Sequence, residues 1–436
     1  MAPRETRSLN VFLNGRRVGR LTKSPSGAID FRYDQGWLDW ENAIPVSLSL
    51  ALREERHVGE PVVAVFDNLL PDSEPIRRRL AERSGAGGPD AYSLLSTIGR
   101  DCIGALQFLP DGEVPLAPNE IKTREISDAE IADKLRGLTQ NPLGFGGDED
   151  FRISLAGVQE KTALFKKDGR WYLPLSTTAT THILKPQIGR LPDGVDLSQS
   201  VENEFLCLKL VRAFGLPVNE ADIEDFEDRR VLVVKRFDRL WTGDGRLLRI
   251  PQEDFCQALS VSPSRKYESE GGPGIKEIAL FLKGSDKPEM DLTTFFRAQI
   301  AFWLLGAIDG HAKNFSVHLA PNKSFSLTPL YDIVSAQPVF DAKQIRKRQM
   351  KLAMAVGKNR HYHLEQITRE HFAQTGTLAQ IPTNVVKDSI EQFLDEGGAA
   401  IDTTIGSLPN TYPAELADCL AKNAKDRLRT LSRTVR

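Results

Sequence analysis

Alternating apolar and polar residues indicate β-strands in the first part of the chain. Residues 11–13 are apolar and are followed by Asn14-Gly15 and a second apolar-patterned segment, which predicts a hairpin closed by a type I′ turn. Residues 29–33 alternate strictly, whereas residues 62–66 are apolar throughout and fit either a short strand or the start of a helix. A β-rich N-terminal domain is therefore expected over residues 1–147, ending at a glycine cluster.

The helical period of 3.6 residues governs much of the later sequence. It predicts a helix over residues 199–214 that stops at Gly215, and a strongly apolar helix over residues 295–308. Strands are expected around the first of these helices, at residues 161–165, 170–173, 182–184 and 231–234. The mixed segment 148–250 and the mostly helical segment 251–436 complete an α+β chain of three parts.

Composition narrows the class of protein. The 436 residues include 57 basic and 59 acidic side chains and are 40% hydrophobic, which is ordinary globular usage and excludes a fibrous or disordered chain. The net charge of −2 argues against a dedicated polyanion binder. The longest apolar run, residues 300–308, is far below the roughly 20 residues of a membrane-spanning helix, and the dispersed cysteines are typical of a reducing compartment. We therefore expect a cytoplasmic protein without a membrane partner.

The segment after the apolar helix carries the strongest chemical signal. Asp309 and Asn314 have the Asp-x-x-x-x-Asn spacing of a kinase catalytic loop, in which the aspartate accepts the proton of the substrate hydroxyl and the asparagine binds Mg²⁺. Asp332 follows as a further metal-binding carboxylate. Lys185 ends a predicted strand, where a lysine that contacts the phosphates of ATP would lie.

Simpler interpretations exist for the same residues. Asp309 fits a helix cap and Asn314 fits a turn, and for that pair alone these structural roles are favoured. The full order of Lys185, Asp309, Asn314 and Asp332 instead favours a kinase, because together they supply the groups that phosphoryl transfer needs. A glycine-rich phosphate loop is missing, since residues 154–161 hold one glycine and no Walker pattern.

Longer motifs extend the pattern from end to end. They are Phe66-Asp-Asn-Leu-Leu-Pro-Asp72, Ile98-Gly-Arg-Asp101, Asp150-Phe-Arg-Ile-Ser154, Gly157-Val-Gln-Glu-Lys-Thr162, Arg236-Phe-Asp-Arg239, Pro251-Gln-Glu-Asp254, Lys266-Tyr-Glu268, Gly271-Gly-Pro-Gly274, Asp309-Gly-His-Ala-Lys-Asn314 and Tyr331-Asp332. With these motifs the chain resembles the HipA-type serine/threonine kinases, which are toxins of bacterial type II toxin–antitoxin pairs. The resemblance implies a fold related to protein kinases and phosphatidylinositol kinases, with a β-rich N-terminal subdomain, an ATP-binding N-lobe over residues 148–250 and a mostly helical C-terminal lobe over residues 251–436.

The resemblance also implies roles for individual residues. Asp309 would be the catalytic base, Asn314 and Asp332 would bind Mg²⁺, and Lys185 would contact the phosphates of ATP. An atypical phosphate loop, an adenine hinge and further residues near the catalytic loop would complete the nucleotide site: Ala156, Gly157, Val158, Gln159, Glu160, Lys161, Lys235, Arg236, Phe237, His311, Lys313 and Tyr331. Lys235 departs from the family, whose members carry an acidic residue there, and this bears on the affinity for the nucleotide.

Regulation and partners follow from the same resemblance. Ser154 is similar to the serine that the family autophosphorylates, in a loop that leaves the site once modified; without the family context, a cap or turn serine is favoured. The expected partners are a HipB-like helix-turn-helix antitoxin, operator DNA bound mainly through that antitoxin, and a protein substrate, which in some members is an aminoacyl-tRNA synthetase. The alternative is a structural corepressor that bridges antitoxin dimers on operator DNA, with weak or lost kinase activity. The basic stretches 343–360 and 422–436 fit either a contact with the DNA backbone or a solvated surface.

Overall fold

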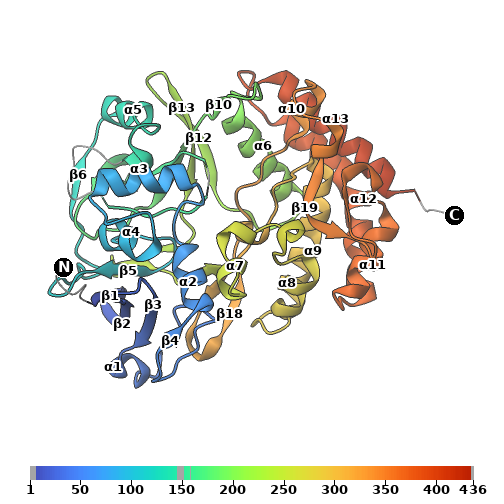
Figure 1. Ribbon diagram of the computed structural model, residues 1–436. Coiled ribbons are helices and arrows are strands. Elements are labelled where there is room, and N and C mark those ends of the chain that lie inside the picture. Colours follow the sequence, from blue (N-terminus) through green and yellow to red (C-terminus); the bar gives the residue numbers. More distant parts are fainter. Residues whose placement is uncertain (1–5, 145–151, 158, 434–436) are drawn as a thin grey trace. The chain divides into compact units, whose positions relative to one another are not determined.

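The computed structural model of the chain describes residues 6–144, 152–157 and 159–433 (Figure 1). These residues form two compact units. Unit 1 comprises Met1–Pro186, Glu224–Ser264 and Ser316–Phe325, and unit 2 comprises Gln187–Ile223, Arg265–Phe315 and Ser326–Arg436. Each unit is therefore built from three separate segments of the chain.

Unit 1 begins with a five-stranded antiparallel sheet in the order β4-β3-β2-β1-β5. The predicted hairpin is confirmed, because Asn14 and Gly15 have the positive φ angles, 47° and 85°, that a type I′ turn requires. The alternating residues 29–33 form β3, in which Phe31 and Tyr33 are buried. The elements of this part are β1 (Arg7–Leu13), β2 (Arg16–Lys23), β3 (Ile29–Tyr33), α1 (Gln35–Leu38), β4 (His57–Val58), α2 (Glu60–Asp67), α3 (Glu74–Ser84), α4 (Ala91–Ile98) and β5 (Leu106–Leu109).

A second, six-stranded sheet follows in the order β12-β13-β9-β7-β8-β6. The four strands predicted after residue 160 are all present, as β7, β8, β9 and β13, and the antiparallel pairs of β9 with β7 and β13 place β9 inside the sheet. Strands β14 and β15 form a separate hairpin, and β16, β17 and β18 form a separate three-stranded sheet. The elements of this region are β6 (Thr123–Glu125), α5 (Asp128–Arg136), β7 (Thr162–Lys167), β8 (Arg170–Pro174), β9 (His182–Pro186), β12 (Ala221–Phe226), β13 (Arg229–Lys235), β14 (Arg239–Trp241), β15 (Leu247–Arg249), β16 (Gln252–Asp254), α7 (Phe255–Ala258), β17 (Ser316–Leu319) and β18 (Phe325–Leu327). Two of the boundaries between the units fall inside strands, one in β12 and one in β18.

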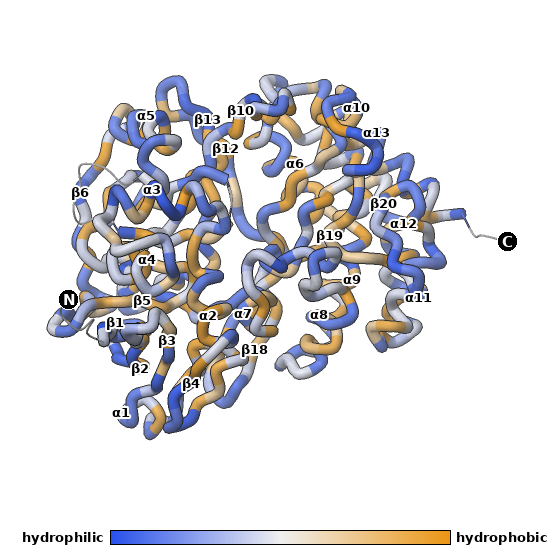
Figure 2. Tube along the Cα trace, viewed as in Figure 1, coloured by the Kyte–Doolittle hydropathy of each residue, from blue (hydrophilic) through white to orange (hydrophobic). Residues whose placement is uncertain are grey.

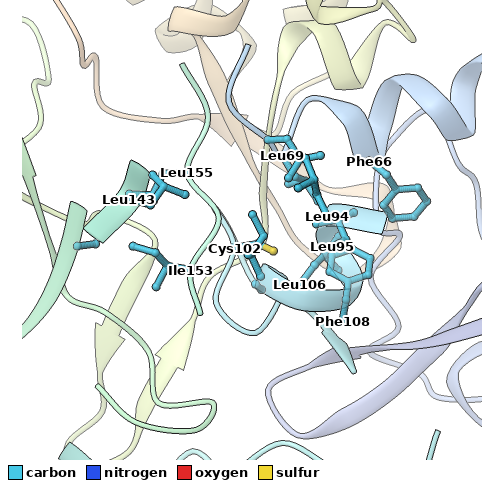
Figure 3. Packing of buried hydrophobic residues seen from close by; sticks show 14 of the residues in the cluster. Phe66, Leu69, Leu94, Leu95, Cys102, Leu106, Phe108, Leu143, Ile153 and Leu155 are labelled. Carbon is cyan, nitrogen blue, oxygen red and sulfur yellow. The ribbon is translucent and has the colours of Figure 1, made fainter. Parts of the chain in front are cut away.

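One hydrophobic core runs through unit 1 and includes side chains from both sheets. Figure 3 shows Phe66 and Phe108 among the labelled side chains of this core, together with Ile153 and Leu155. Residues 62–66 belong to helix α2 and contribute buried valines, so the helical alternative for that segment holds. The predicted boundary at residue 147 lies outside the described residues, and the three-part division stays a prediction. The core joins residues from both sides of that boundary, because neither sheet alone covers its apolar face.

Unit 2 is mostly helical. The predicted apolar helix is α9 (Pro288–Leu305), which starts with a proline in its first turn and ends earlier than expected. Gly306 ends it because its φ of 66° is left-handed, so Ile308 lies beyond the helix. The other elements are β10 (Gly189–Arg190), β11 (Asp196–Leu197), α6 (Ser200–Ala213), α8 (Ile275–Leu282), α10 (Gln337–Asp341), β19 (Lys351–Val356), β20 (His361–His363), α11 (Arg369–Leu378), α12 (Thr383–Gly406) and α13 (Ala414–Leu431).

The core of unit 2 forms around α9. Phe296 and Trp303 are buried on α9 and make edge-to-face contacts with Phe372 of α11. Helices α12 and α13 pack against α9 and against each other, and the tube in Figure 2 alternates between hydrophobic and hydrophilic colours along α13, as expected for a helix with one buried face. In the described part of the chain, no helix is both long and apolar enough to cross a membrane.

Candidate functional site

The predicted catalytic loop directly follows α9 in unit 2. Asp309 is exposed, three residues beyond the glycine that ends the helix. Gly310 has to be a glycine, because a Cβ atom there would lie 2.4 Å from the ring of Phe302. The loop then closes into a 3₁₀ turn over Ala312–Asn314, and its backbone is fixed by hydrogen bonds from His311 N to Asp309 O (2.8 Å) and from Asn314 N to His311 O (2.9 Å).

Asn314 and Asp332, the predicted metal ligands, lie together in unit 2. The Asn314 Nδ2 atom donates to Asp332 Oδ2 at 3.2 Å, and the Asn314 Oδ1 atom accepts from His311 N at 3.2 Å. Asp332 is exposed and has a left-handed φ of 58°, a conformation that costs on the order of 1 kcal/mol in a residue with a Cβ atom. Such backbone strain concentrates at functional sites.

The donor set fits Mg²⁺. A carboxylate and an amide oxygen are ligands that Mg²⁺ accepts, and this ion usually takes one or two carboxylates and fills its remaining positions with phosphate oxygens and water. No cluster of three or more His, Cys, Asp or Glu side chains suited to a metal occurs among the residues that the structure describes. Asn314 and Asp332 therefore suit a Mg²⁺ site in which the phosphates of a nucleotide supply further ligands.

Lys313 and Tyr331 support the same region. Lys313 and His311 are buried, and the Tyr331 hydroxyl donates to the Lys313 carbonyl oxygen at 2.8 Å. Tyr331 directly precedes Asp332, so this bond connects the metal-ligand segment to the catalytic loop. The structure therefore brings together all six residues that the sequence predicted in unit 2: Asp309, His311, Lys313, Asn314, Tyr331 and Asp332.

Tyr267 was missed as a site residue. Its hydroxyl donates to Asp309 Oδ1 at 2.5 Å, and its ring stands edge-on to His311 at 5.0 Å between centroids. In the sequence it occurs only within the motif Lys266-Tyr-Glu268, to which no role was given. The signal was therefore present, but the distance of 42 residues to Asp309 hid the contact.

The predicted phosphate-binding residues lie in unit 1. Lys185 is buried on β9, opposite Leu232 of β13. Lys161 Nζ donates to the Ala156 carbonyl oxygen at 2.8 Å, and Gly157 has a left-handed φ of 103° at which a Cβ atom would lie 2.7 Å from that amine. The amine of Lys161 therefore lies against the backbone of Ala156 and Gly157.

The rest of the predicted loop is only partly described. Gln159 Nε2 donates to the Pro186 carbonyl oxygen at 3.2 Å, and Glu160 Oε2 accepts from the Thr139 hydroxyl at 3.1 Å. Val158 lies outside the described residues. Gln159 thus links the loop to Pro186, the last residue of β9. Lys185 is the preceding residue of the same strand, so β9 connects the predicted loop to the predicted phosphate-binding lysine.

Ser154 is fully buried. Its backbone N–H donates to Asp101 O at 2.9 Å, and its hydroxyl donates to the Leu69 carbonyl oxygen at 2.8 Å. A phosphate cannot be accommodated at this hydroxyl without displacing the segment, because a dianion would replace a satisfied donor in the protein interior. Autophosphorylation of Ser154 stays a prediction, and it requires the segment to leave this position.

The predicted hinge residues differ in their exposure to solvent. Lys235 is exposed at the end of β13, and Phe237 is half-buried with its ring edge-on to His318 at 5.6 Å between centroids. Arg236 is buried, and its backbone N–H donates to Thr181 O at 2.9 Å. Its guanidinium group donates to both oxygens of Asp238, at 2.9 and 2.6 Å, so the side chain of Arg236 serves the fold.

Asp101 is the centre of this buried ionic network. Its carboxylate accepts from Arg239 Nη2 at 2.8 Å, from Arg249 Nε at 3.0 Å and from Arg236 Nη1 at 3.3 Å. Burial opposes the charged form, but the three guanidinium groups outweigh it and hold the pKa of Asp101 well below its ordinary value. Burial, and next to it the charge of Arg236, lower the pKa of Arg239 to about 10.

The two basic stretches make contacts of their own in unit 2. Lys347, Lys425 and Arg429 form ion pairs with acidic neighbours. Arg427 donates to the Leu304 carbonyl oxygen at 2.9 Å, and its burial lowers its pKa to about 10. Part of the basic charge is thus engaged within the unit, and a contact with DNA stays a prediction.

Comparisons with known proteins agree with this arrangement. The model of the HipA N-terminal domain matches residues 9–109, and that of the HipA-like C-terminal domain matches residues 153–401. The protein Y4mE of Sinorhizobium fredii, which is named as a kinase, is 35% identical over 96% of this chain and 98% of its own length. The serine/threonine-protein kinase toxin HipA of Shewanella oneidensis is 29% identical over 82% of this chain and 80% of its own length.

A solved structure supports the fold. The complex of HipA, HipB and operator DNA from Shewanella oneidensis contains a chain that superposes with a TM-score of 0.79 at 25% identity, covering 97% of this chain and 96% of that chain. The expected α+β kinase-like fold is therefore confirmed. With family models matching most of its length and a relative at 35% identity, this chain belongs to the HipA family.

Proposed function

We propose that this chain is a protein serine/threonine kinase that uses ATP and Mg²⁺, and that it is the toxin of a type II toxin–antitoxin pair. The observation that supports this most is that unit 2 contains an exposed Asp309 together with Asn314 and Asp332. The Nδ2 atom of Asn314 and the Oδ2 atom of Asp332 are 3.2 Å apart. Family membership and the kinase names of the relatives support the same proposal.

In the proposed reaction, Asp309 accepts the proton of the acceptor hydroxyl while the hydroxyl oxygen bonds to the γ-phosphorus of ATP and ADP leaves. Exposure of Asp309 is needed for this role, because the acceptor comes from another protein or from a displaced segment. Asn314 and Asp332 would hold Mg²⁺ through their side-chain oxygens. When bound, the ion neutralises charge on the phosphates.

Residues of unit 1 would bind the nucleotide. Lys185 and Lys161 supply positive charge for the phosphates, and the backbone of residues 156–161 supplies N–H donors. The adenine would lie along the backbone of Lys235, Arg236 and Phe237. The side chain of Arg236 is not needed for this, since its guanidinium group is hydrogen-bonded to Asp238. The exposed Lys235 adds a positive charge to this segment.

A direct test is incubation with ATP and Mg²⁺ followed by intact-mass measurement and peptide mapping. We expect one added phosphate, located at Ser154, and its loss in both Asp309→Ala and Asp332→Ala. Asp402→Ala is the matched control, because Asp402 is an exposed carboxylate of unit 2 that pairs only at the surface with Lys425. Absence of any modification together with absence of ATP binding would contradict the proposal. Candidate acceptors are then tested with the same variants, starting with aminoacyl-tRNA synthetases.

We further propose that the chain assembles with a HipB-like antitoxin and reaches operator DNA mainly through it. This rests on the solved relative, which was determined with HipB and operator DNA. Binding of operator DNA by the antitoxin should be measured with and without this chain across salt concentrations. A contribution from this chain changes the affinity or the salt slope, whereas identical curves would count against it. The corepressor alternative requires such a change to persist in Asp309→Ala.

A further inference from the structure

The segment that contains Tyr267 is attached to the catalytic loop at several points. The Tyr267 hydroxyl donates to Asp309 Oδ1 at 2.5 Å, and the ring stands against His311. One residue earlier, the carbonyl oxygen of Lys266 accepts from Ala312 N at 3.3 Å. All of these residues belong to unit 2, so side chain and backbone of one segment both support the loop that carries Asp309.

Glycines fold this segment tightly on itself. The backbone N–H of Gly272 donates to the Tyr267 carbonyl oxygen at 2.9 Å, and a Cβ atom on Gly272 would lie 2.1 Å from the carbonyl oxygen of Arg265. A Cβ atom on Gly274 would lie 2.5 Å from the carboxyl carbon of Glu268. The collision with backbone explains the glycine at position 272, whereas a side chain at Gly274 would displace the Glu268 carboxyl group. Gly271 has a left-handed φ of 89°, which favours glycine for a different reason.

Glu268 fixes the segment to the rest of unit 2. One of its oxygens accepts from Ala355 N of β19 at 2.5 Å, and the other pairs with Arg360 at 3.2 Å. Its side chain is only 13% exposed, and burial raises its pKa above the ordinary value. Tyr267 therefore stands between two anchors, the catalytic loop on one side and a core strand on the other.

We propose that Tyr267 is a positioning residue for Asp309, an inference that rests on the proposed kinase function. Asp309 is exposed on a loop, so its carboxylate has rotational freedom unless a neighbour orients it. The hydrogen bond from the Tyr267 phenol to Oδ1 holds the carboxylate of Asp309 in one orientation, in which it would receive the proton of the acceptor hydroxyl. The anchoring of residues 266–274 favours this role over that of a displaceable gate, which would need a mobile segment.

The experiment compares wild type with Tyr267→Phe, which removes only the hydroxyl. Phosphate incorporation into the chain is followed by mass over a range of ATP concentrations at fixed Mg²⁺. We expect the maximal rate to fall about 10–100-fold while the half-saturating ATP concentration stays within about twofold, because a misoriented base slows the chemical step without weakening nucleotide binding. Thermal unfolding of the variant is measured alongside, to verify that it is folded.

Two further variants separate positioning from general structural damage. Tyr412→Phe removes a comparable phenol of unit 2, one that donates to the Glu202 carbonyl oxygen at 2.7 Å, and it should leave the maximal rate unchanged. Gly272→Ala displaces the segment while retaining the phenol, and it should reproduce the rate loss of Tyr267→Phe. An equal rate loss in Tyr412→Phe would overturn the specific role of Tyr267.

The outcomes distinguish this inference from the proposed function. An active wild type with an equally active Tyr267→Phe variant would overturn the positioning role alone. A faster Tyr267→Phe variant would also overturn it and would identify the phenol as a gate that the acceptor displaces. A wild type that incorporates no more phosphate than Asp309→Ala would overturn the kinase proposal and this inference with it.

Discussion

Asp101 of unit 1 and Asp309 of unit 2 are the same amino acid in opposite environments. Asp101 is 2% exposed and accepts hydrogen bonds from three arginines, whereas Asp309 is exposed on a loop and contacts the hydroxyl of Tyr267. A carboxylate that is surrounded by cations in the interior has no capacity left for a reacting group. The one at the surface is exposed, so an acceptor can approach it. Burial, rather than residue type, separates a structural aspartate from a candidate catalytic one.

The buried ionic network around Asp101 shows how many hydrogen bonds accompany a charged group in the protein interior. Thr180 adds two further donors to Asp101, through its backbone N–H at 3.0 Å and its hydroxyl at 2.8 Å. Arg239 also donates to the carbonyl oxygens of Gly104 and Thr180, at 2.8 and 3.1 Å. Desolvation of the ions is thus offset by many short contacts, which connect the segment after α4 to the β14–β15 hairpin.

The largest expected effect is on the stability of the Asp101→Asn variant. Removing one charge leaves three buried guanidinium groups with Asp238 as their remaining acidic partner in the network, and breaking such a buried pair costs about 3–5 kcal/mol. Denaturant unfolding measures the loss. Asp244→Asn in the exposed pair with Arg246 is the control and should be indistinguishable from wild type. Equal stability of Asp101→Asn and wild type would remove the contrast with Asp309.

Glu253 gives a second, pH-dependent effect. This carboxyl group is 1% exposed and faces the backbone N–H of Leu48 and the side chain of Ser47, and its burial raises its pKa from 4.5 to about 8. The folded state therefore binds the proton more tightly than the unfolded state, so stability present below pH 4.5 is lost as the pH rises through about 8. Between pH 5 and pH 8, wild type should lose about 3–4 kcal/mol relative to Glu253→Gln. Parallel pH profiles of the two proteins would contradict this.

The smallest expected effect on stability belongs to Asp309→Asn. The side chain is exposed, so the free energy of unfolding should change by no more than about 0.5 kcal/mol, while phosphate incorporation should fall by about 10²–10⁴-fold. Unfolding and activity are measured on the same preparation. A stability loss as large as that of Asp101→Asn would show that Asp309, too, is a structural residue.

Local patterns of apolar and polar residues were sufficient to predict several of the helices and strands. The hairpin at Asn14-Gly15, the strands β7, β8, β9 and β13, and the helix α6 follow from the alternation and spacing of apolar residues. The end of α9 was placed at residue 308 because the apolar run continues through Gly306, yet the left-handed backbone of that glycine ends the helix at Leu305. A hydropathy pattern does not report the sign of φ.

The set of residues around Asp309 was only partly predictable. Asp309, Asn314 and Asp332 lie close in sequence and have a spacing with a known chemical meaning, so they could be named. Tyr267 and Asp101 could not, because each acts through partners 42 or more residues away. Arg236 was predicted among the nucleotide-binding residues, but its side chain lies in the buried network.

The sequence by itself determined the family, the order of the elements and the residues able to carry out phosphoryl transfer, because these depend on local spacing and residue chemistry. Only the tertiary structure decided which charged groups are buried and which are exposed, how the chain divides into two units, and that Tyr267 contacts Asp309. Burial and long-range contacts arise when distant segments pack into one core. Their energies depend on that packing and are not written in any one stretch of the chain.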